Sequence, residues 1–163
     1  MWEKYYEPHR QAGDPLYNDD CIFTPAAKVF KSDTNAPKLL AEDDWWDVDV
    51  ITCAAPNLRE NPSNRMNPNA GSRNANIDPE ELYKLLNTRI RRIFEIAIAE
   101  EADVLILGAF GCGAFRNDPE IVASVFAELN QEYRNYFYII EYAVFCVGRE
   151  VVNYETFRRI IKG

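Results

Sequence analysis

The chain has 163 residues, of which 47% are hydrophobic, and its formal net charge is -8 with an isoelectric point near 4.7. This length is enough for one domain with a real core. The acidic balance disfavours broad docking on nucleic acid or on an anionic membrane, because either partner needs a basic protein face. One small anion is not excluded, since backbone N–H groups can hold it without net positive charge.

The absence of long apolar runs and of a signal peptide predicts a cytoplasmic protein. No apolar run approaches the roughly 20 residues that a membrane span needs. The first ten residues, MWEKYYEPHR, lack the small-residue cleavage site of a signal peptide. The four cysteines are scattered and form no C-x-x-C pair, so we expect them to be buried free thiols. With a single histidine beside them, we expect no metal site and no other cofactor.

The first 44 residues contain short elements and turns. Residues 1–20 are mixed and turn-rich. The segment CIFTP (21–25) predicts a short strand ended by Pro25, and AKVFK (27–31) predicts a second extended piece. Residues 32–44 are expected to form a surface connection.

A strand and a long polar segment follow. WWDVDVITCAAPN (45–57) alternates at first and then becomes continuously apolar, which is typical of a buried central strand. Residues 56–78 contain seven asparagines, three prolines and one glycine, and predict a long loop. That loop is either a surface insertion or a segment that closes over a ligand.

The best-signalled helix spans residues 78–100. Asp78 suits the N-cap, Pro79 the first helical position, and Glu81 the third position of a capping box. The arginines 89, 91 and 92 interrupt its apolar pattern, and most are expected on the solvated face. The apolar positions that recur at helical spacing are Leu82, Leu85, Leu86, Ile93, Phe94 and Ala97.

The last third of the chain alternates strands with helices. ADVLILG (102–108) predicts a short buried strand, and Asn117 or Asp118 caps a second helix that has Pro119 at its first position. YFYIIEYAVFCVG (136–148) predicts a long strand, and Asn153 caps a short C-terminal helix. This order predicts an α/β fold with a mostly parallel sheet and helices on both faces.

The segment LILGAFGCGAFRNDPE (105–120) is the strongest candidate for a binding site. In open α/β sheets, ligands bind beyond the carboxyl ends of the strands, and here three glycines lie between such an end and a helix start. Glycine backbone and a helix N-terminus together suit an anionic group such as phosphate. The spacing is not the dinucleotide fingerprint and lacks a P-loop lysine, so a tight strand-to-helix turn without a ligand is the alternative. Cys112 is disfavoured as a nucleophile because the one histidine is far away in sequence.

The amino-acid sequences of several segments resemble those of the microbial-type poly(ADP-ribose) glycohydrolase family. The resembling segments are LGAFGCGAFRNDPEIVA, VDVITCAAPN, NYETF and, near the N-terminus, YYEPHRQAGDPLYNDDCIFTPAAKVFKSD. They extend over nearly the whole chain. The resemblance implies a macrodomain-like three-layer α/β/α fold with a central, mixed and mostly parallel sheet, formed by residues 1–163 as a single domain.

The resemblance also implies which residues bind. The partner would be ADP-ribose or poly(ADP-ribose), with the backbone of the glycine segment around the diphosphate and Phe115 near the distal ribose. Ala55, Pro56 and Asn57 would line the same cleft, and Phe145 would contact adenine or pack in the core. The residues expected around the diphosphate and ribose are Gly108, Phe110, Gly111, Cys112, Gly113, Ala114 and Phe115.

One departure from the family concerns catalysis. Its members carry a glycine-rich loop followed by Gln-Glu-Glu, whose glutamate protonates the leaving ribosyl oxygen, and this chain contains neither Gly-Gly-Gly nor Gln-Glu-Glu. We therefore expect no catalytic residue and at most binding. The carboxylates that could stand in, at Asp19, Asp20, Glu60 and Glu101, are expected to be solvated surface charges.

The same departure predicts an incomplete domain. The chain resembles the C-terminal half to two-thirds of the family domain, so the sheet would lack N-terminal strands and leave an edge uncovered. Residues 1–44, a second chain or an oligomer would then cover it. A structural or interaction protein that has kept the fold without the ligand is the alternative function.

Overall fold

The computed structural model describes residues 2–63, 65, 68, 75–148 and 151–162. Much of the asparagine-rich segment therefore lies outside the described residues, including positions 64, 66–67 and 69–74. In chain order the elements are η1 (Trp2–Tyr6), α1 (Glu7–Ala12), β1 (Cys21–Val29), η2 (Glu42–Asp44), β2 (Trp46–Cys53), α2 (Pro79–Ala99), β3 (Val104–Leu107), α3 (Pro119–Tyr133), η3 (Arg134–Tyr136), β4 (Ile139–Tyr142) and α4 (Val152–Lys162).

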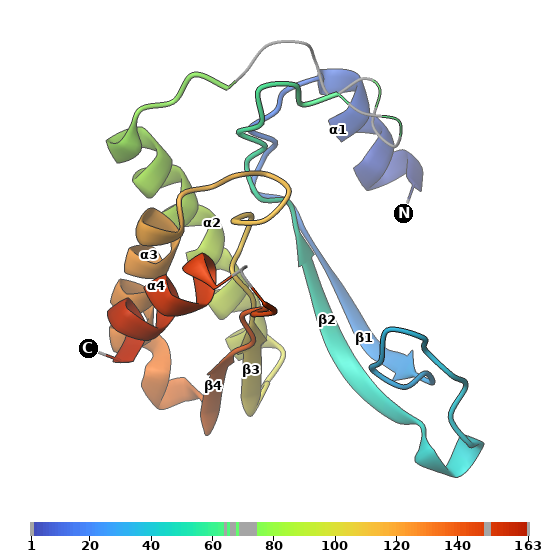
Figure 1. Cartoon of the computed structure of the whole chain (residues 1–163). Helices are drawn as coiled ribbons and strands as arrows, with labels where there is room; N and C mark the ends of the chain where they lie inside the picture. Colours follow the sequence, from blue (N-terminus) through green and yellow to red (C-terminus); the bar gives the residue numbers. More distant parts are fainter. Residues whose placement is uncertain (1, 64, 66–67, 69–74, 149–150, 163) are drawn as a thin grey trace.

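The strands form two separate two-stranded sheets rather than one central sheet. β1 pairs with β2 in antiparallel fashion, and β3 pairs with β4 in parallel. In Figure 1 the β1–β2 pair extends away from the helices, and β3–β4 lies beside them. The prediction of a single mixed sheet is therefore wrong for the part of the chain that the structure describes, although the α/β class is confirmed.

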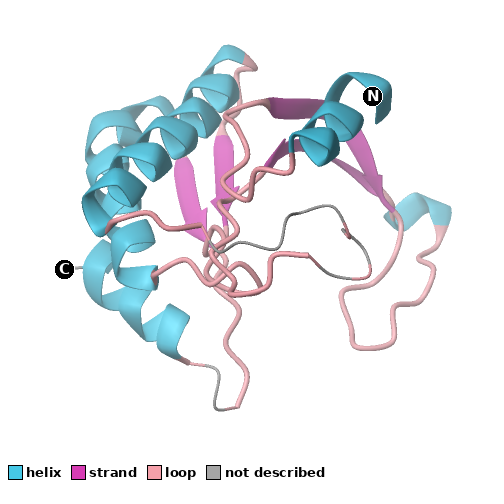
Figure 2. Cartoon of the chain, turned by 90° about the horizontal axis from the view of Figure 1, so that it is seen from above, coloured by secondary structure: helices cyan, strands magenta, loops and turns pink. Residues whose placement is uncertain are grey.

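Helices α2, α3 and α4 lie together on one side of β3–β4, as Figures 1 and 2 show from two directions. The core between them and the inner face of β3 includes Leu105 and Leu107. The opposite face of β3–β4 is exposed: Val104, Ile106 and Ile139 keep 48%, 69% and 54% of their surface accessible. The predicted third layer is thus not formed by the described helices. The helical residues of this core include Leu86, Ile90, Phe94, Val122, Phe126, Leu129 and Phe157.

The helix starts follow local signals in the sequence. Asp78 caps α2 by accepting hydrogen bonds from the backbone N–H groups of Glu80 and Glu81, both at 2.9 Å. Asp118 caps α3 in the same way through the N–H of Glu120. The predicted cap at Asn153 is wrong, because α4 already begins at Val152. None of the described helices is both long and apolar enough to cross a membrane.

Pro25 does not end the first strand. β1 continues through it to Val29, with a register shift between Thr24 and Ala27 that is typical of a β-bulge. Ala26 has a φ of 51°, and its N–H donates to the Asp49 carboxylate of β2 at 2.8 Å. Proline is tolerated in a strand at such a bulge because no ladder hydrogen bond is lost there.

Two predicted strands differ from those observed. β2 is mostly exposed along its length rather than central and buried, since it has a strand neighbour on one edge only among the described elements. β4 spans four residues, and the segment from Ala143 onward leaves the sheet. Both differences follow from the small size of the sheets.

Candidate functional site

The candidate site lies where three strands end on the same side of the molecule. β3 and β4 are parallel neighbours, with Leu107 opposite Tyr142, so their carboxyl ends lie together. The glycine turn of residues 108–116 leaves β3 there and leads to α3. The segment after β2 reaches the same place: Leu58 donates its N–H to the carbonyl oxygen of Phe115 at 2.9 Å. The two segments that the sequence singles out as candidate site residues thus lie next to each other.

Gly111 is the glycine that the turn requires. Its φ of 71° is in the left-handed region, where a side chain is strained. A Cβ at Gly111 would lie 2.4 Å from Nδ2 of Asn117 and 2.6 Å from Cβ of Ala55. Gly108 and Gly113 have no positive φ, and a Cβ at Gly113 would meet nothing within 4 Å. The turn conformation therefore does not require glycine at position 113, and the space beside this residue is open.

Asn117 joins the turn to the segment after β2. Its side-chain amide donates to the carbonyl oxygens of Pro56 at 2.8 Å and Gly111 at 3.1 Å, and its own N–H donates to Gly111 at 3.0 Å. The side chain is buried, and its Oδ1 atom has no hydrogen-bond partner among the described residues. Asn117 therefore holds the two predicted site segments in one geometry.

Several amides of the turn remain available for a ligand. The N–H groups of Cys112 and Arg116 donate within the turn, to Ala109 and Gly113. Among the residues that the structure describes, the N–H groups of Gly111, Gly113 and Ala114 donate to no acceptor. The start of α3 is less available, because Asp118 already caps it and adds a negative charge there. An anion would thus be held by the turn and not by the helix end.

Phe115 is packed between two residues that sequence reasoning did not single out. Its ring lies 6.2 Å from the ring of Tyr17, and the guanidinium carbon of Arg59 lies 6.0 Å from its ring centre. Arg59 is itself held by Asn57, whose Oδ1 accepts from Nε at 3.2 Å. The predicted aromatic therefore comes with a cation beside it.

The other predicted site residues follow the ends of β2, β3 and β4. Ala55, Pro56 and Asn57 are buried beneath the glycine turn. Gly108 and Phe110 line a gap between β2 and β3. Phe145 follows β4 and is 72% exposed, which rules out core packing and leaves its side chain free for a contact.

Cys112 is not an activated nucleophile. Burial, with a smaller effect from the Asp118 carboxylate, raises the pKa of its thiol to about 12. The thiol therefore stays protonated at neutral pH, and it lies 3.7 Å from the carbonyl oxygen of Phe110. The start of α3 therefore does not lower the pKa of this thiol.

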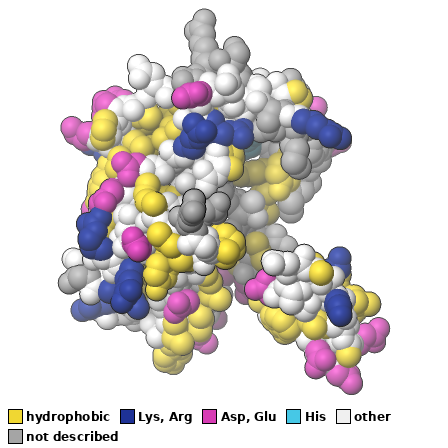
Figure 3. All heavy atoms as spheres, viewed as in Figure 1, with side chains coloured by type: hydrophobic (Ala, Val, Ile, Leu, Met, Phe, Trp, Pro, Cys, Tyr) yellow, Lys and Arg dark blue, Asp and Glu magenta, His cyan; other side chains and the backbone are white. Residues whose placement is uncertain are grey.

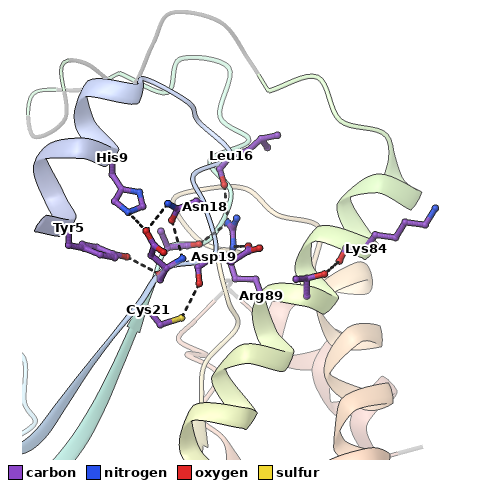
Figure 4. Close-up of polar contacts among 11 residues, drawn as sticks. Tyr5, His9, Leu16, Asn18, Asp19, Cys21, Lys84 and Arg89 are labelled. Atoms are coloured by element: carbon purple, nitrogen blue, oxygen red, sulfur yellow. Dashed lines mark hydrogen bonds and ion pairs between the residues drawn. The ribbon is translucent and has the colours of Figure 1, made fainter.

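Asp19 makes a structural contact, although its side chain is still 46% exposed. It accepts a hydrogen bond from Nε of Arg89 at 3.0 Å, as Figure 4 shows. Arg89 also donates to the carbonyl oxygens of Leu16 and Ala54, both at 2.9 Å, and is 1% exposed. The prediction that the arginines of α2 lie mostly on the solvated face is wrong for Arg89. The contact ties residues 16–19 and the end of β2 to the helix.

The remaining candidate carboxylates lie on the surface. Asp20 faces Nε2 of His9 at 3.3 Å and is exposed. Glu60 and Glu101 are exposed as well. Among the described residues, no cluster of three or more His, Cys, Asp or Glu side chains could hold a metal ion. None of these groups contacts the glycine turn.

All four cysteines are free thiols, but they are less buried than predicted. Cys21, Cys53 and Cys112 are half-buried and Cys146 is exposed. Cys21 and Cys53 lie opposite each other on β1 and β2. A hydrogen bond from Cys53, with the nearby charge of Arg92, lowers the pKa of Cys21 to about 7. The same hydrogen bond, together with burial, raises the pKa of Cys53, so only Cys21 of the pair differs from Cys112.

Asn117, Arg59, Tyr17 and Arg89 are the residues that sequence reasoning missed. Asn117 was weighed only as a helix cap, and Arg59 lies in a segment that was interpreted as a loop. A buried polar side chain beside a turn is recognised from its partners, and those of Asn117 lie 6 and 61 residues away. The only local signals are turn-forming dipeptides, Asn61-Pro62 close to Arg59 and Asn117-Asp118 at the end of the glycine turn.

Solved structures from two bacteria are similar to this chain. The poly(ADP-ribose) glycohydrolase of Deinococcus radiodurans in complex with ADP-ribose is 34% identical, with a TM-score of 0.77, and the match covers 98% of this chain and 59% of that one. The enzyme of Thermomonospora curvata is 28% identical, with a TM-score of 0.80, and the match covers 98% of this chain and 53% of that one. The structure of the same enzyme bound to the inhibitor ADP-HPD is also 28% identical, with a TM-score of 0.79. That match covers 97% of this chain and 55% of the enzyme. No protein-family model and no curated protein sequence matches. This chain therefore spans 53–59% of the length of these relatives.

Proposed function

Because this chain is homologous to bacterial poly(ADP-ribose) glycohydrolases over somewhat more than half of their length, we propose that it forms the part of an ADP-ribose site that holds the diphosphate and the distal ribose. The observation that carries the proposal is the turn around Gly111. Its unbonded amides at Gly111, Gly113 and Ala114 are donors without an acceptor among the described residues. Backbone amides without an acceptor suit a diphosphate in a chain whose net charge is negative.

The neighbouring residues fit the other parts of the ligand. Phe115, with Arg59 beside its ring, offers an apolar face and a cation near the turn. Phe145, three residues after the end of β4, offers an exposed aromatic surface for the adenine. Ala55, Pro56 and Asn57 support the turn from below. Each assignment follows the family resemblance and is a proposal for this chain.

We propose binding without hydrolysis for residues 1–163 alone. Cleavage of a glycosidic bond needs a carboxylic acid placed at the leaving oxygen. Asp19 is paired with Arg89, and Asp20, Glu60 and Glu101 are exposed without a contact to the turn. A cytoplasmic location remains part of the proposal.

Calorimetric titration with ADP-ribose tests the proposal. The chain should bind with a dissociation constant below about 1 mM, which corresponds to roughly 4 kcal/mol. Gly113→Ala should weaken binding by about 1–2 kcal/mol, roughly tenfold, because its methyl group enters the open space above the amides. The melting temperature of the ligand-free protein should not change, since that methyl group meets no protein atom within 4 Å.

The outcomes separate the functions. The absence of heat and of thermal stabilisation at millimolar ADP-ribose would contradict the proposal and favour a structural protein that has kept the fold. Equal affinity of wild type and Gly113→Ala would place the ligand elsewhere. Release of ADP-ribose from poly(ADP-ribose) by the chain alone would contradict the assignment of binding without hydrolysis.

A further inference from the structure

Cys21 and Cys53 lie opposite each other at the base of the β1–β2 pair. Cys21 is the first residue of β1, Cys53 is the last residue of β2, and the two are register partners in the antiparallel pair. In Figure 1 both strands leave the helical body together at this base, and Figure 3 shows the far part of the pair standing apart from that body. Opposite residues in antiparallel strands have Cα atoms about 4.5–5.5 Å apart, which lies within the range that a disulfide spans. A disulfide between them is therefore compatible with the existing strand register.

A buried arginine holds the two chain segments together just beyond the thiols. Arg89 donates from Nε to the carboxylate of Asp19 at 3.0 Å, two residues before β1 begins. It also donates from Nη1 to the carbonyl oxygen of Ala54 at 2.9 Å, directly after β2 ends. Figure 4 shows Cys21 next to Asp19, whose carboxylate faces Arg89. The strand pairing on one side and Arg89 on the other thus keep the two thiols as neighbours.

The surroundings divide the pair into an attacking and a resolving thiol. The hydrogen bond from Cys53, with the charge of Arg92, lowers the pKa of Cys21 to about 7, so much of this thiol is thiolate at neutral pH. The hydrogen bond with Cys21, together with burial, raises the pKa of Cys53, which therefore keeps its proton while Cys21 is charged. Both thiols are only half-buried, and Arg92 is exposed on α2. A small anionic reagent can therefore approach Cys21 beside a positive charge.

We propose that Cys21 and Cys53 are a redox-active dithiol, which a low-molecular-weight disulfide RSSR converts into a cross-strand disulfide. The Cys21 thiolate attacks one sulfur of RSSR, which forms a mixed disulfide on Cys21 and releases RS⁻. Cys53 then loses its proton to solvent and attacks the sulfur of Cys21, which forms the bond between the two cysteines and expels the second RS⁻. Each RS⁻ takes up one of the two protons that the protein thiols have lost. The two thiols are oxidised, and RSSR is reduced to two RSH.

The first step prepares the second. Once Cys21 is part of the mixed disulfide it has no thiolate, so the hydrogen bond and the charge that hold the proton on Cys53 are gone. Burial and the Asp19 carboxylate still raise the pKa of Cys53, and the charge of Arg89 lowers it. Cys53 therefore loses its proton more easily after the first step than before it.

Two other roles fit the pair less well. A structural metal ion takes four ligands, and no cluster of three or more His, Cys, Asp or Glu side chains that could hold a metal lies in the described part of the chain. Thiols that only fill apolar space keep their protons, as Cys112 does with its pKa raised to about 12. Cys21 does not share this property, and it has a second thiol opposite it.

The experiment uses the reduced chain with Cys146→Ser, which removes the exposed thiol, and treats it with oxidised glutathione at neutral pH. No ADP-ribose is present, so the result does not depend on the proposed function. Free thiols are blocked at intervals, and products are identified by intact-mass and peptide mass spectrometry. We expect the Cys21–Cys53 disulfide, without retained glutathione, to form at least about tenfold faster than a glutathione adduct on Cys112. Dithiothreitol should reverse it.

Two serine variants separate the roles of the thiols. Cys53→Ser should stop at a glutathione adduct on Cys21, because the resolving thiol is missing while the serine hydroxyl can still donate to the thiolate. Cys21→Ser should leave Cys53 at least about tenfold less reactive than Cys21 is in Cys53→Ser, because burial still raises the pKa of Cys53. Thermal melting of both reduced variants checks that they are folded.

A third variant tests the charge beside the attacking thiol. Arg92→Gln should slow formation of the disulfide by at least about threefold, because the positive charge that favours the Cys21 thiolate is lost. Arg158→Gln is the matched control: Arg158 is exposed on α4 and is not among the charges that act on Cys21, so the rate should not change.

Three results would overturn the proposal. The first is a glutathione adduct on Cys21 that persists in the chain with both thiols, without the Cys21–Cys53 disulfide. The second is modification of Cys21 and Cys112 at equal rates. The third is a Cys21→Ser variant whose Cys53 reacts as fast as Cys21 does in Cys53→Ser.

Discussion

The side chain of Asn117 holds the carbonyl oxygens of Gly111 and Pro56 at once, at 3.1 Å and 2.8 Å. These two carbonyl groups belong to segments that follow different strands, β3 and β2. The glycine turn is therefore not free to move independently of the segment after β2. A preorganised turn of this kind costs a bound anion less conformational freedom than a flexible loop would.

Asn117→Ala should lower both stability and affinity for ADP-ribose. The variant leaves the buried carbonyl group of Pro56 without its donor, although the carbonyl group of Gly111 keeps the backbone N–H of residue 117, and the loss costs about 1–3 kcal/mol of unfolding free energy in urea. Asn35→Ala is the control, because Asn35 is exposed and should change stability by less than about 0.5 kcal/mol. Unchanged stability in Asn117→Ala would show that Asn117 does not hold the turn.

Gly111→Ala should destabilise the protein even without a ligand. Alanine in the left-handed region costs about 1–3 kcal/mol, and its Cβ would also press against Asn117 and Ala55. Gly113→Ala should differ from wild type by less than about 0.5 kcal/mol in the same urea titration. Equal loss of stability in the two variants would contradict the assignment of the strained position to Gly111.

Arg89→Ala should detach the N-terminal residues from α2. The change leaves the carbonyl groups of Leu16 and Ala54 without their buried donor, while the half-exposed Asp19 is still hydrated, and it should cost about 1–3 kcal/mol. Lys84→Ala removes an exposed ion pair with Glu80 and should cost less than about 0.5 kcal/mol. Limited proteolysis should cut residues 13–20 faster in Arg89→Ala alone. Equal cleavage in both variants would contradict the anchoring role.

Cys21 should react with iodoacetamide faster than Cys112 at pH 7.5. The pKa of Cys21 is lowered to about 7 and that of Cys112 is raised to about 12, so the reactive thiolate is present mainly at Cys21. Cys53→Ala removes the thiol that lowers the pKa of Cys21 and should slow its reaction. Peptide mass spectrometry gives both rates. A rate at Cys21 that Cys53→Ala does not change would refute this explanation.

Phe145→Ala should weaken ADP-ribose binding without changing stability. Phe145 is 72% exposed, so its truncation removes little core packing, and unfolding free energy should change by less than about 0.5 kcal/mol. Loss of an aromatic contact with adenine should lower the affinity by about 0.5–1.5 kcal/mol. Tyr138→Ala is the matched control at another exposed aromatic. Calorimetry that gives one affinity for wild type and both variants would remove Phe145 from the site.

The features that sequence reasoning predicted are those set by nearby residues. Asp78 and Asp118 cap their helices through N–H groups two or three residues later, so the signal is local. The turn after β3 was likewise predicted from glycines at short spacing, and the left-handed φ of Gly111 agrees with it.

The features that sequence reasoning missed depend on partners that are far away along the chain. Pro25 was expected to end a strand, but Asp49 accepts from Ala26 and turns the position into a bulge. Arg89 was expected in solvent because it interrupts the apolar pattern of its helix. Its acceptors lie 35 to 73 residues away along the chain, so no local signal reveals them. The long strand expected at 136–148 is apolar except for Glu141, but β3 offers it a partner over four residues only. The pattern of apolar residues alone does not reveal how many residues of a neighbouring strand are available for pairing.

The central claim is that the turn around Gly111 binds the diphosphate of ADP-ribose through its backbone amides. Titration of the ¹⁵N-labelled chain with ADP-ribose, followed by the amide resonances of the turn, tests this most directly. The account predicts shifts at Gly111, Gly113 and Ala114 that saturate with a dissociation constant below about 1 mM, and a weaker response in Gly113→Ala. Amide resonances of the turn that stay unchanged at millimolar ADP-ribose would contradict it.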